Sequence, residues 1–321
     1  MPAPTHYRSD NRRLENFLDP LLQPRIVEHL YGRDQEIETL VGWLRRADNT
    51  GEPVHPVVVA EGGTGKTELA KQIAKHLFLS DKALIRVDMA EFSESFNASK
   101  LIGAPAGYVG FREENKLSDL VKKYPYSVVL FDEIEKAHPQ IFNLLLSVLD
   151  EGYLTDATGK KINFRNTIIV FTSNLGSQEA SQQLGFSDVT NKTADDEQAL
   201  IYEQAAKRFF SQEFINRLDK ILAFRSLNKI DLQKIAKNKL EALKNRLESQ
   251  NLDLNWQNLS TGLATWALNR KQEARGLDLI IRENLENSLA KYLLNQENSP
   301  KKSKRKIQVK LKDEKFTFSL K

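Results

Sequence analysis

The sequence contains no cysteine in its 321 residues, which excludes disulfides and thiolate-bound metals. Its five histidines are scattered without the spacing of a metal site. No stretch approaches the roughly 18 apolar residues of a membrane-spanning helix, and residues 1–30 lack the uninterrupted apolar core of a secretory signal. We therefore expect a cytoplasmic protein with no membrane partner.

The charge is close to balanced, with a formal net charge of +4. Most of the excess lies in KKSKRK, Lys301 to Lys306, and we find neither a basic face nor a helix-turn-helix module. No nucleic-acid partner is therefore expected. We interpret this segment as a solvated turn before a short hairpin formed by IQVKLK and KFTFSLK, with contact to an acidic surface as the alternative.

Strand-like apolar runs alternate with helical patterns between residues 57 and 224, which predicts an α/β fold with a parallel five-stranded sheet covered by helices. The expected strands are PVVVA, ALIRVDM, SVVLFDE, TIIVFTSN and KILAF. After residue 224 helical patterns dominate, and residues 177–197 are the most loop-like interior segment. We divide the chain into an N-terminal arm (1–30), a large α/β domain (31–225) and a small, mainly helical domain (226–321) that ends in the hairpin. The arm either docks onto a partner or packs as a helix on its own domain.

A glycine-rich loop, AEGGTGKT, follows the apolar run VVV and precedes a helical pattern. In such loops the backbone N–H groups point at phosphates, the lysine neutralises them and the next hydroxyl ligates Mg²⁺. Alanine stands where the motif has its first glycine, and alanine follows the turn if its φ stays negative. We therefore predict a site for ATP and Mg²⁺ formed by Ala60, Glu61, Gly62, Gly63, Thr64, Gly65, Lys66, Thr67 and Glu68.

Polar residues end two further predicted strands. Asp132 and Glu133 close SVVLFDE, and Asn174 closes TIIVFTSN. Because parallel strands end at the same edge of a sheet, these side chains are expected beside the phosphate loop. Asp132 would hold the Mg²⁺ shell together with Thr67, Glu133 would orient the attacking water, and Asn174 would bond the water or the γ-phosphate.

Several separated blocks carry a resemblance to one family. LIGAPAGYVGF, PYSVVLFDEIEKAHPQIFNLLLSVLDEGYLTD, INFRNTIIVFTSNLGS and FFSQEFINRLDKILAF resemble the second ATPase module of the Clp chaperones, which are ring-forming AAA+ unfoldases and disaggregases. The resemblance covers roughly residues 30 to 290. It implies a nucleotide domain followed by a helical lid, assembled into a homo-oligomeric ring, expected to be a hexamer, with ATP between subunits.

Two arginines and one tyrosine match nucleotide-site positions of that family. Arg217 in EFINRLD is similar to the arginine finger of the family, which reaches into the neighbouring subunit's nucleotide site. The alternative is an arginine on a helix surface that pairs with Asp219. Arg275 resembles the lid arginine that senses the γ-phosphate, although the residues around it depart from the family's pattern. Tyr31 resembles the residue packed on adenine, where the family usually has an aliphatic side chain.

Three segments bear on substrates and partners. Tyr108 and Val109 resemble the pore loop that grips an extended protein chain, and the loop from Asp156 to Lys161 is a second candidate for the pore. Burial of Tyr108 as a loop anchor is the alternative. The tripeptide Leu184, Gly185 and Phe186 resembles the peptide with which protease-linked Clp unfoldases dock to their peptidase, with a local contact as the alternative.

The resemblance favours an ATP-driven unfoldase or remodelling chaperone built from a single motor module. The leader before Tyr31 is too short for the substrate domain and first ATPase module of the two-module chaperones. A nucleotide-controlled scaffold that binds a partner without threading it remains the alternative, favoured by Ala60 and the altered surroundings of Arg275. An AAA+ ATPase that loads onto DNA is disfavoured because it predicts a basic face.

Overall fold

The computed structural model describes residues 20–50, 57–59, 62–94, 97, 101–103, 117–183, 192–218, 221–270, 273–295 and 305–320. These residues form two compact units. The larger unit contains Gly65–Arg225 and the described residues up to Val59, and the smaller unit contains Gly62–Thr64 and the described residues from Ser226 onward. Each unit has a hydrophobic core of its own.

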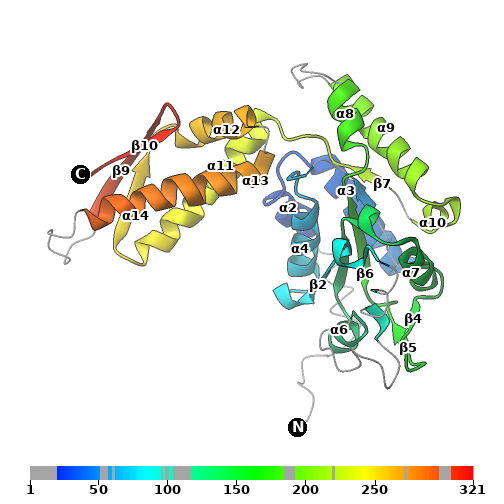
Figure 1. Ribbon diagram of the computed structural model, residues 1–321. Helices are drawn as coiled ribbons and strands as arrows, with labels where there is room; N and C mark the ends of the chain where they lie inside the picture. Colours follow the sequence, from blue (N-terminus) through cyan, green and yellow to red (C-terminus); the bar gives the residue numbers. More distant parts are fainter. Residues whose placement is uncertain are drawn as a thin grey trace, which may run out of the picture. The chain divides into compact units, whose positions relative to one another are not determined.

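The larger unit, which contains helices α2 to α10 (Figure 1), is built on a five-stranded sheet with the strand order β2-β3-β6-β1-β7. Every neighbouring pair of strands is parallel. This confirms the α/β fold and the parallel sheet predicted from the alternating pattern. The strands are β1 (Val57–Val59), β2 (Leu84–Asp88), β3 (Val128–Asp132), β6 (Ile168–Ser173) and β7 (Ile221–Ala223).

Both faces of this sheet are buried, which explains why its central strands are apolar throughout. On β3, Val128 and Leu130 enter one core while Val129 and Phe131 enter the other. The first core is covered by α2 (Leu22–Val27), α3 (Asp34–Thr50) and α4 (Lys66–Leu77) (Figure 1). The second is covered by α6 (Leu117–Lys123), α7 (Pro139–Glu151), α8 (Ser177–Gln183), α9 (Lys192–Phe209) and α10 (Gln212–Asn216). Short 3₁₀ helices are η1 (Asp81–Ala83), η2 (Met89–Phe92) and η4 (Ile134–Lys136).

Helix α2 lies within the segment that the sequence assigned to an N-terminal arm. Its Leu22 and Ile26 are almost fully buried against α3 and α4, whereas Leu21 is exposed. Residues 20–30 therefore pack on their own unit, and residues 1–19 lie outside the described part of the chain.

The loop predicted for residues 177–197 was partly wrong, because α8 and the start of α9 fall within it. Both the N–H and the hydroxyl of Ser177 donate to the carbonyl oxygen of Asn174, at 3.2 and 2.6 Å. These bonds satisfy a helix start, and Ala180 then buries its side chain in the core. The polar composition of α8 reflects a helix that buries only one side.

A small hairpin, β4 (Tyr153–Thr155) and β5 (Lys161–Asn163), follows the end of α7 and was not predicted. Its loop is organised by Asp156, whose Oδ1 accepts hydrogen bonds from the backbone of Thr158 and Lys160 at 2.9 and 3.0 Å. The Nζ of Lys122 lies 3.2 Å from the other carboxylate oxygen. Burial alone would raise the pKa of Asp156, but these hydrogen bonds hold that pKa well below its usual value.

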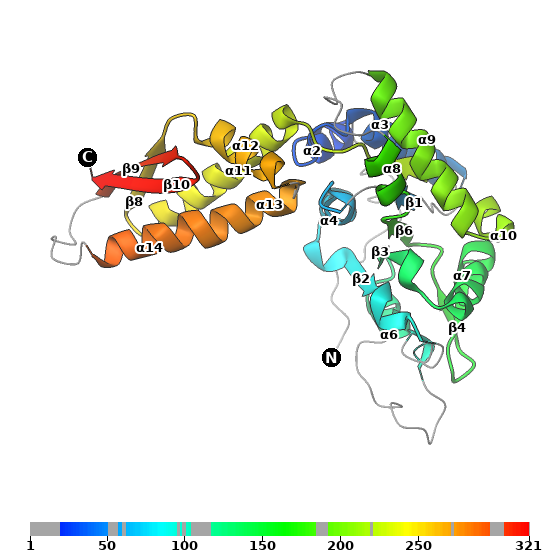
Figure 2. The same ribbon diagram turned by 45° about the horizontal axis from the view of Figure 1, so that its top comes forward.

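The smaller unit packs helices against a three-stranded sheet with the order β10-β9-β8 (Figure 2). The hairpin predicted at the C-terminus is confirmed as β9 (Arg305–Lys312) and β10 (Lys315–Leu320), and the end of KKSKRK belongs to β9 rather than to a turn. The parallel strand β8 (Leu252–Trp256) was not predicted. The helical elements are α11 (Lys229–Glu248), α12 (Leu259–Asn269), α13 (Glu273–Leu279), the π-helical segment η5 (Ile280–Glu286) and α14 (Asn287–Leu294).

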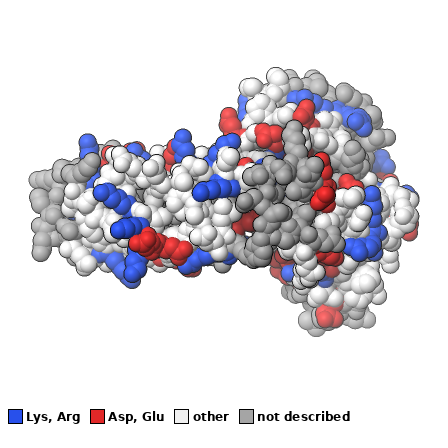
Figure 3. Space-filling view, turned by 90° about the horizontal axis from the view of Figure 1, so that it is seen from above, with Lys and Arg blue, Asp and Glu red and all other residues white. Residues whose placement is uncertain are grey.

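The surface is mixed in charge. On the face drawn in Figure 3, basic and acidic side chains are interspersed among uncharged ones. Among the described helices, none combines the length and the apolar character needed to cross a membrane.

We predict that Asp156→Ala lowers the free energy of unfolding by about 1–3 kcal/mol, because several hydrogen bonds to a largely buried, charged acceptor are lost together. The matched control is Asp119→Ala, which removes an exposed carboxylate 4.0 Å from the same lysine, Lys122, and should cost less than about 0.5 kcal/mol. Because the folded-state pKa of Asp156 lies below the reference value of 3.8, its contribution is complete above that pH and is lost as the pH falls through the folded-state pKa. Urea unfolding between pH 7 and pH 3 measures the difference, and equal losses in the two variants would contradict the assignment.

Candidate functional site

The glycine-rich loop leaves β1, which lies between β6 and β7 in the sheet. Gly65 caps α4 with φ 101°, a left-handed conformation, and a Cβ atom there would approach Cδ2 of Leu30 to 3.1 Å. Glycine is therefore required at this position. Helix α4 starts at Lys66, so the N–H groups of its first turn lie at the loop, where they favour an anion. Ala60 and Glu61 lie outside the described residues.

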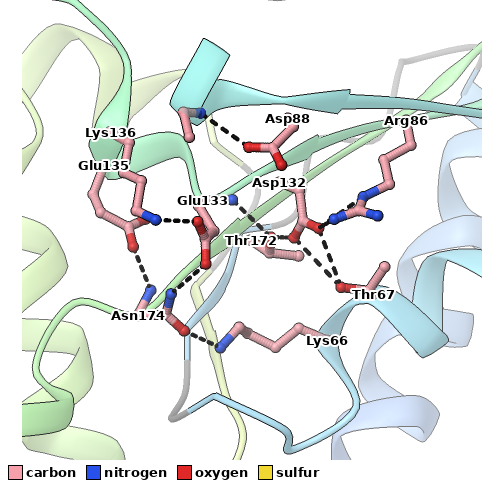
Figure 4. Close-up of polar contacts among 11 residues, drawn as sticks. Lys66, Thr67, Arg86, Asp88, Asp132, Glu133, Glu135, Lys136, Thr172 and Asn174 are labelled. Carbon is pink, nitrogen blue, oxygen red and sulfur yellow. Dashed lines mark hydrogen bonds and ion pairs between the residues drawn. The ribbon is translucent and has the colours of Figure 1, made fainter. Parts of the chain in front are cut away.

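The side chain of Lys66 is hydrogen-bonded to Asn174, which follows the end of β6. The ammonium group of Lys66 is largely buried and donates to Oδ1 of Asn174 at 2.7 Å. The amide nitrogen of Asn174 in turn donates to Oε1 of Glu133 at 3.3 Å (Figure 4). A single amide thus joins the loop lysine to the carboxylate that follows β3.

Asp132 is buried at the end of β3 and faces the start of α4. The hydroxyl of Thr67 lies 3.4 Å from both of its carboxylate oxygens. Thr172 donates a short hydrogen bond to Oδ1, and Arg86 of β2 contacts Oδ2 through Nε at 2.9 Å and through a terminal nitrogen at 2.7 Å. Sequence reasoning identified Thr67 and Asp132 but missed Arg86.

Glu133 is held by its backbone and by both carboxylate oxygens. Its φ and ψ are 57° and 51°, a left-handed conformation unusual for a residue with a side chain, and its N–H donates to the hydroxyl of Thr172 at 3.2 Å. Its carboxylate accepts from Asn174 and makes a short ion pair with Lys136. The hydrogen bond and the charge of Glu133 raise the pKa of Lys136. Lys136, three positions after Glu133, was also missed.

The other predicted site residues belong to other elements or lie outside the described residues. Arg217 follows α10 and forms a short ion pair with Asp150 of α7, while Asp219, the alternative partner considered from the sequence, lies outside the described residues. Tyr31 is half-buried before α3. Arg275 is exposed on α13 of the smaller unit. Residues 108–109 and 184–186, the predicted pore and docking segments, are also outside the described residues.

A magnesium ion fits the donors at this edge. Thr67 and Asp132 supply a hydroxyl and a carboxylate, the hard oxygen ligands that Mg²⁺ takes. Within the described ranges, no cluster of three or more His, Cys, Asp or Glu side chains could hold a metal. Because Mg²⁺ in nucleotide sites uses one or two protein ligands and completes its shell with phosphate and water, this sparse set is what a nucleotide-borne ion needs.

The sheet order and the polar cluster define an α/β domain with a phosphate-binding loop, and two family models match the chain. The model described as "AAA domain (Cdc48 subfamily)" matches residues 53–221. The model described as "C-terminal, D2-small domain, of ClpB protein" matches residues 227–313. The chain therefore belongs to the AAA family of ATPases, in its Clp chaperone branch.

Curated relatives are similar over nearly the whole chain. Chaperone protein ClpB of Prochlorococcus marinus is 39% identical over 319 residues, which cover 95% of this chain and 35% of that protein. The ClpA homologue of Pyropia yezoensis, an ATP-dependent Clp protease ATP-binding subunit, is 38% identical over 92% of this chain and 36% of its own length. The chloroplastic ClpC2 of Oryza sativa is 37% identical over 85% and 31%. The chain thus spans about a third of the length of these relatives.

Among solved structures, the closed state of Hsp104 with ATPγS and FITC casein is similar, with a TM-score of 0.80 and 30% identity. The similarity covers 99% of this chain and 53% of that one. The whole described fold, including the smaller unit, therefore has its counterpart in a chaperone.

We predict that Thr172→Val lowers ATP turnover, because the hydroxyl bonds both the Asp132 carboxylate and the Glu133 N–H. Loss of these bonds leaves the Glu133 N–H without this acceptor and removes one donor from the buried Asp132 carboxylate, which should also cost about 1–3 kcal/mol of stability. The matched control is Thr167→Val, just before the start of the same strand, where a similarly buried hydroxyl donates to the carbonyl of Phe164 at 2.7 Å. Turnover should fall in the first variant alone, and equal turnover at equal stability would contradict this role.

Proposed function

We propose that the chain is an ATP-hydrolysing motor module that assembles with copies of itself into a ring, expected to be a hexamer, and remodels protein substrates. The observation that carries this proposal is the contact of Asn174 with both Lys66 and Glu133. It brings a phosphate-binding lysine and a candidate base together through an amide that adds no charge of its own.

The chain's own groups have distinct tasks in hydrolysis. Lys66 and the N–H groups of the loop bind the phosphates, and Thr67 and Asp132 hold Mg²⁺. When bound, Mg²⁺ supplies positive charge against the phosphate oxygens. Glu133 orients the attacking water, for which one of its two present contacts, with Asn174 or Lys136, is exchanged.

Residues elsewhere in the chain would complete the site in a ring. We assign Arg217 as the charge supplied to a neighbouring subunit, which makes hydrolysis depend on assembly. Its side chain is 41% exposed, and an ion pair with a partner as exposed as Asp150 is weak enough to exchange. Arg275 as the γ-phosphate sensor and Tyr31 as the adenine contact rest on the family resemblance.

Protein is the proposed substrate. Tyr108 and Val109 would grip an extended chain in the pore, and the similar Hsp104 structure contains FITC casein. Docking of a Clp-type peptidase through Leu184, Gly185 and Phe186 is a further part of the proposal. Its support is the set of relatives named as ATP-binding subunits of Clp protease.

We expect ATP turnover by the purified chain to rise steeply with protein concentration. Glu133→Gln should retain ATP binding and lose turnover by about 10²–10⁴-fold, the usual contribution of a positioned base. Steady-state hydrolysis and binding of a fluorescent ATP analogue measure the two effects. Turnover that persists in Glu133→Gln would remove this residue from the catalytic role.

For Tyr108→Ala we expect loss of protein remodelling with ATP turnover close to that of the unmodified chain, because the aromatic surface contacts substrate rather than nucleotide. Tyr108→Phe is the control, since it keeps the ring. Unfolding of a fluorescent model protein measures the effect. Remodelling by the alanine variant at full rate would rule out the pore assignment.

A nucleotide-controlled scaffold is the second candidate. The observation that favours it is the engagement of both Glu133 oxygens, which leaves the candidate base committed to protein groups in this structure. ATP binding without ATP turnover at any protein concentration would support the scaffold function over the motor function.

A further inference from the structure

Arg86 lies on β2, the edge strand of the parallel sheet, in the otherwise apolar stretch LIRV. Its neighbours Ile85 and Val87 enter the core on the other face. Arg86 therefore lies on the face that carries α4, and its side chain reaches Asp132 on the adjacent strand (Figure 4). Both contacting nitrogens, at 2.9 and 2.7 Å, are directed at one oxygen, Oδ2.

The carboxylate of Asp132 is held on its two flanks. Thr172 donates to Oδ1 on one side, and Arg86 donates to Oδ2 on the other. Between them, the hydroxyl of Thr67 is equidistant from the two oxygens, 3.4 Å from each. A carboxylate has about four lone-pair sites, so the flanking donors leave its open edge facing Thr67.

The simplest alternative is a surface ion pair of little consequence. Arg86 itself is 54% exposed, and exposed pairs are weak. Its partner, however, is only 9% exposed, and a buried carboxylate needs bonded counter-charge to offset its burial. Only an arginine fork provides two donors in fixed geometry; a lysine supplies a single mobile charge.

We infer that Arg86 is a positioning residue for the magnesium site. It fixes the Asp132 carboxylate with its open edge toward Thr67, so that both metal-binding oxygens are pre-oriented when Mg²⁺ arrives with nucleotide. This inference rests on the proposed function. Arg86 contacts the carboxylate and not the ion, so its loss weakens metal binding while nucleotide binding without metal is unaffected.

The test is a Mg²⁺ titration of fluorescent ATP analogue binding, using the full chain. Arg86→Gln should require about 10- to 100-fold more Mg²⁺ for half-maximal binding, the usual effect of removing a group that orients a metal ligand. Binding in EDTA should match that of the unmodified chain. Arg86→Lys should fall between the two, because it restores the charge without the fork.

Arg208→Gln is the matched control. It removes another exposed arginine of the larger unit, paired with Glu179 at 3.7 Å, and should leave the Mg²⁺ requirement unchanged. An unchanged or lowered requirement in Arg86→Gln would overturn the inference. If that variant does not fold, an unchanged requirement in Arg86→Lys does the same.

The outcome separates this inference from the proposed function. If binding by the unmodified chain does not depend on Mg²⁺, both fail. If it does depend on Mg²⁺ and the Arg86 variants behave like the unmodified chain, only the positioning role fails.

Discussion

The insertion of β6 between β1 and β3 is the constraint on which the site depends. Parallel strands end at one edge, so whatever follows β6 must lie between the loop after β1 and the acidic pair at the end of β3. That position is taken by Thr172 within the strand and Asn174 just beyond it. Both side chains bond in two directions, and they tie the phosphate loop to Asp132 and Glu133. A different strand order would separate the same residues.

The charges at this edge are compensated within the chain. Arg86 faces Asp132, Lys136 faces Glu133, and Lys66 is bonded to a neutral amide rather than to a carboxylate. Of these three cations, Lys66 exchanges its contact most readily, because phosphate is an anion and the amide is not. In the proposed motor, phosphate entry would draw Lys66 away from Asn174 and free the amide to turn toward water or phosphate. Nucleotide binding would then be coupled to the surroundings of Glu133.

The sequence predicted the large-unit fold well because its strands are buried on both faces and read as uninterrupted apolar runs. It also predicted which residues end the strands, so Lys66, Thr67, Asp132, Glu133 and Asn174 were identified before their proximity was known. Arg86 and Lys136 were missed for different reasons. Arg86 lies inside a strand, and the only sign of its role in the sequence is that it is a charged residue among the apolar residues of LIRV. Lys136 was missed because its contact with Glu133, three positions earlier, requires a helical turn that was not predicted from the sequence.

Contacts between residues far apart in the sequence could not be predicted from the sequence. Arg217 was assigned to a neighbouring subunit's site, with a pair to Asp219 as the alternative; the structure pairs it with Asp150, which the fold brings from the end of α7. Strand β8 was missed because LDLNW carries polar residues on the side away from its core. These cases share a cause: local patterns predict burial and helix or strand, whereas contact partners depend on how whole elements pack.

The intramolecular contact of Arg217 bears on the choice between motor and scaffold. An arginine that acts in a neighbouring subunit's site needs another partner when that subunit is absent. A nearby carboxylate can serve as this partner without holding the arginine tightly. Asp150 is 36% exposed, so the pair is screened and exchanges readily for the stronger, multiply charged phosphate. A purely structural arginine would instead be expected with a buried partner, as Arg86 has in Asp132. The contrast between these two arginines favours a mobile role for Arg217 and a fixed one for Arg86, in agreement with the proposed ring motor.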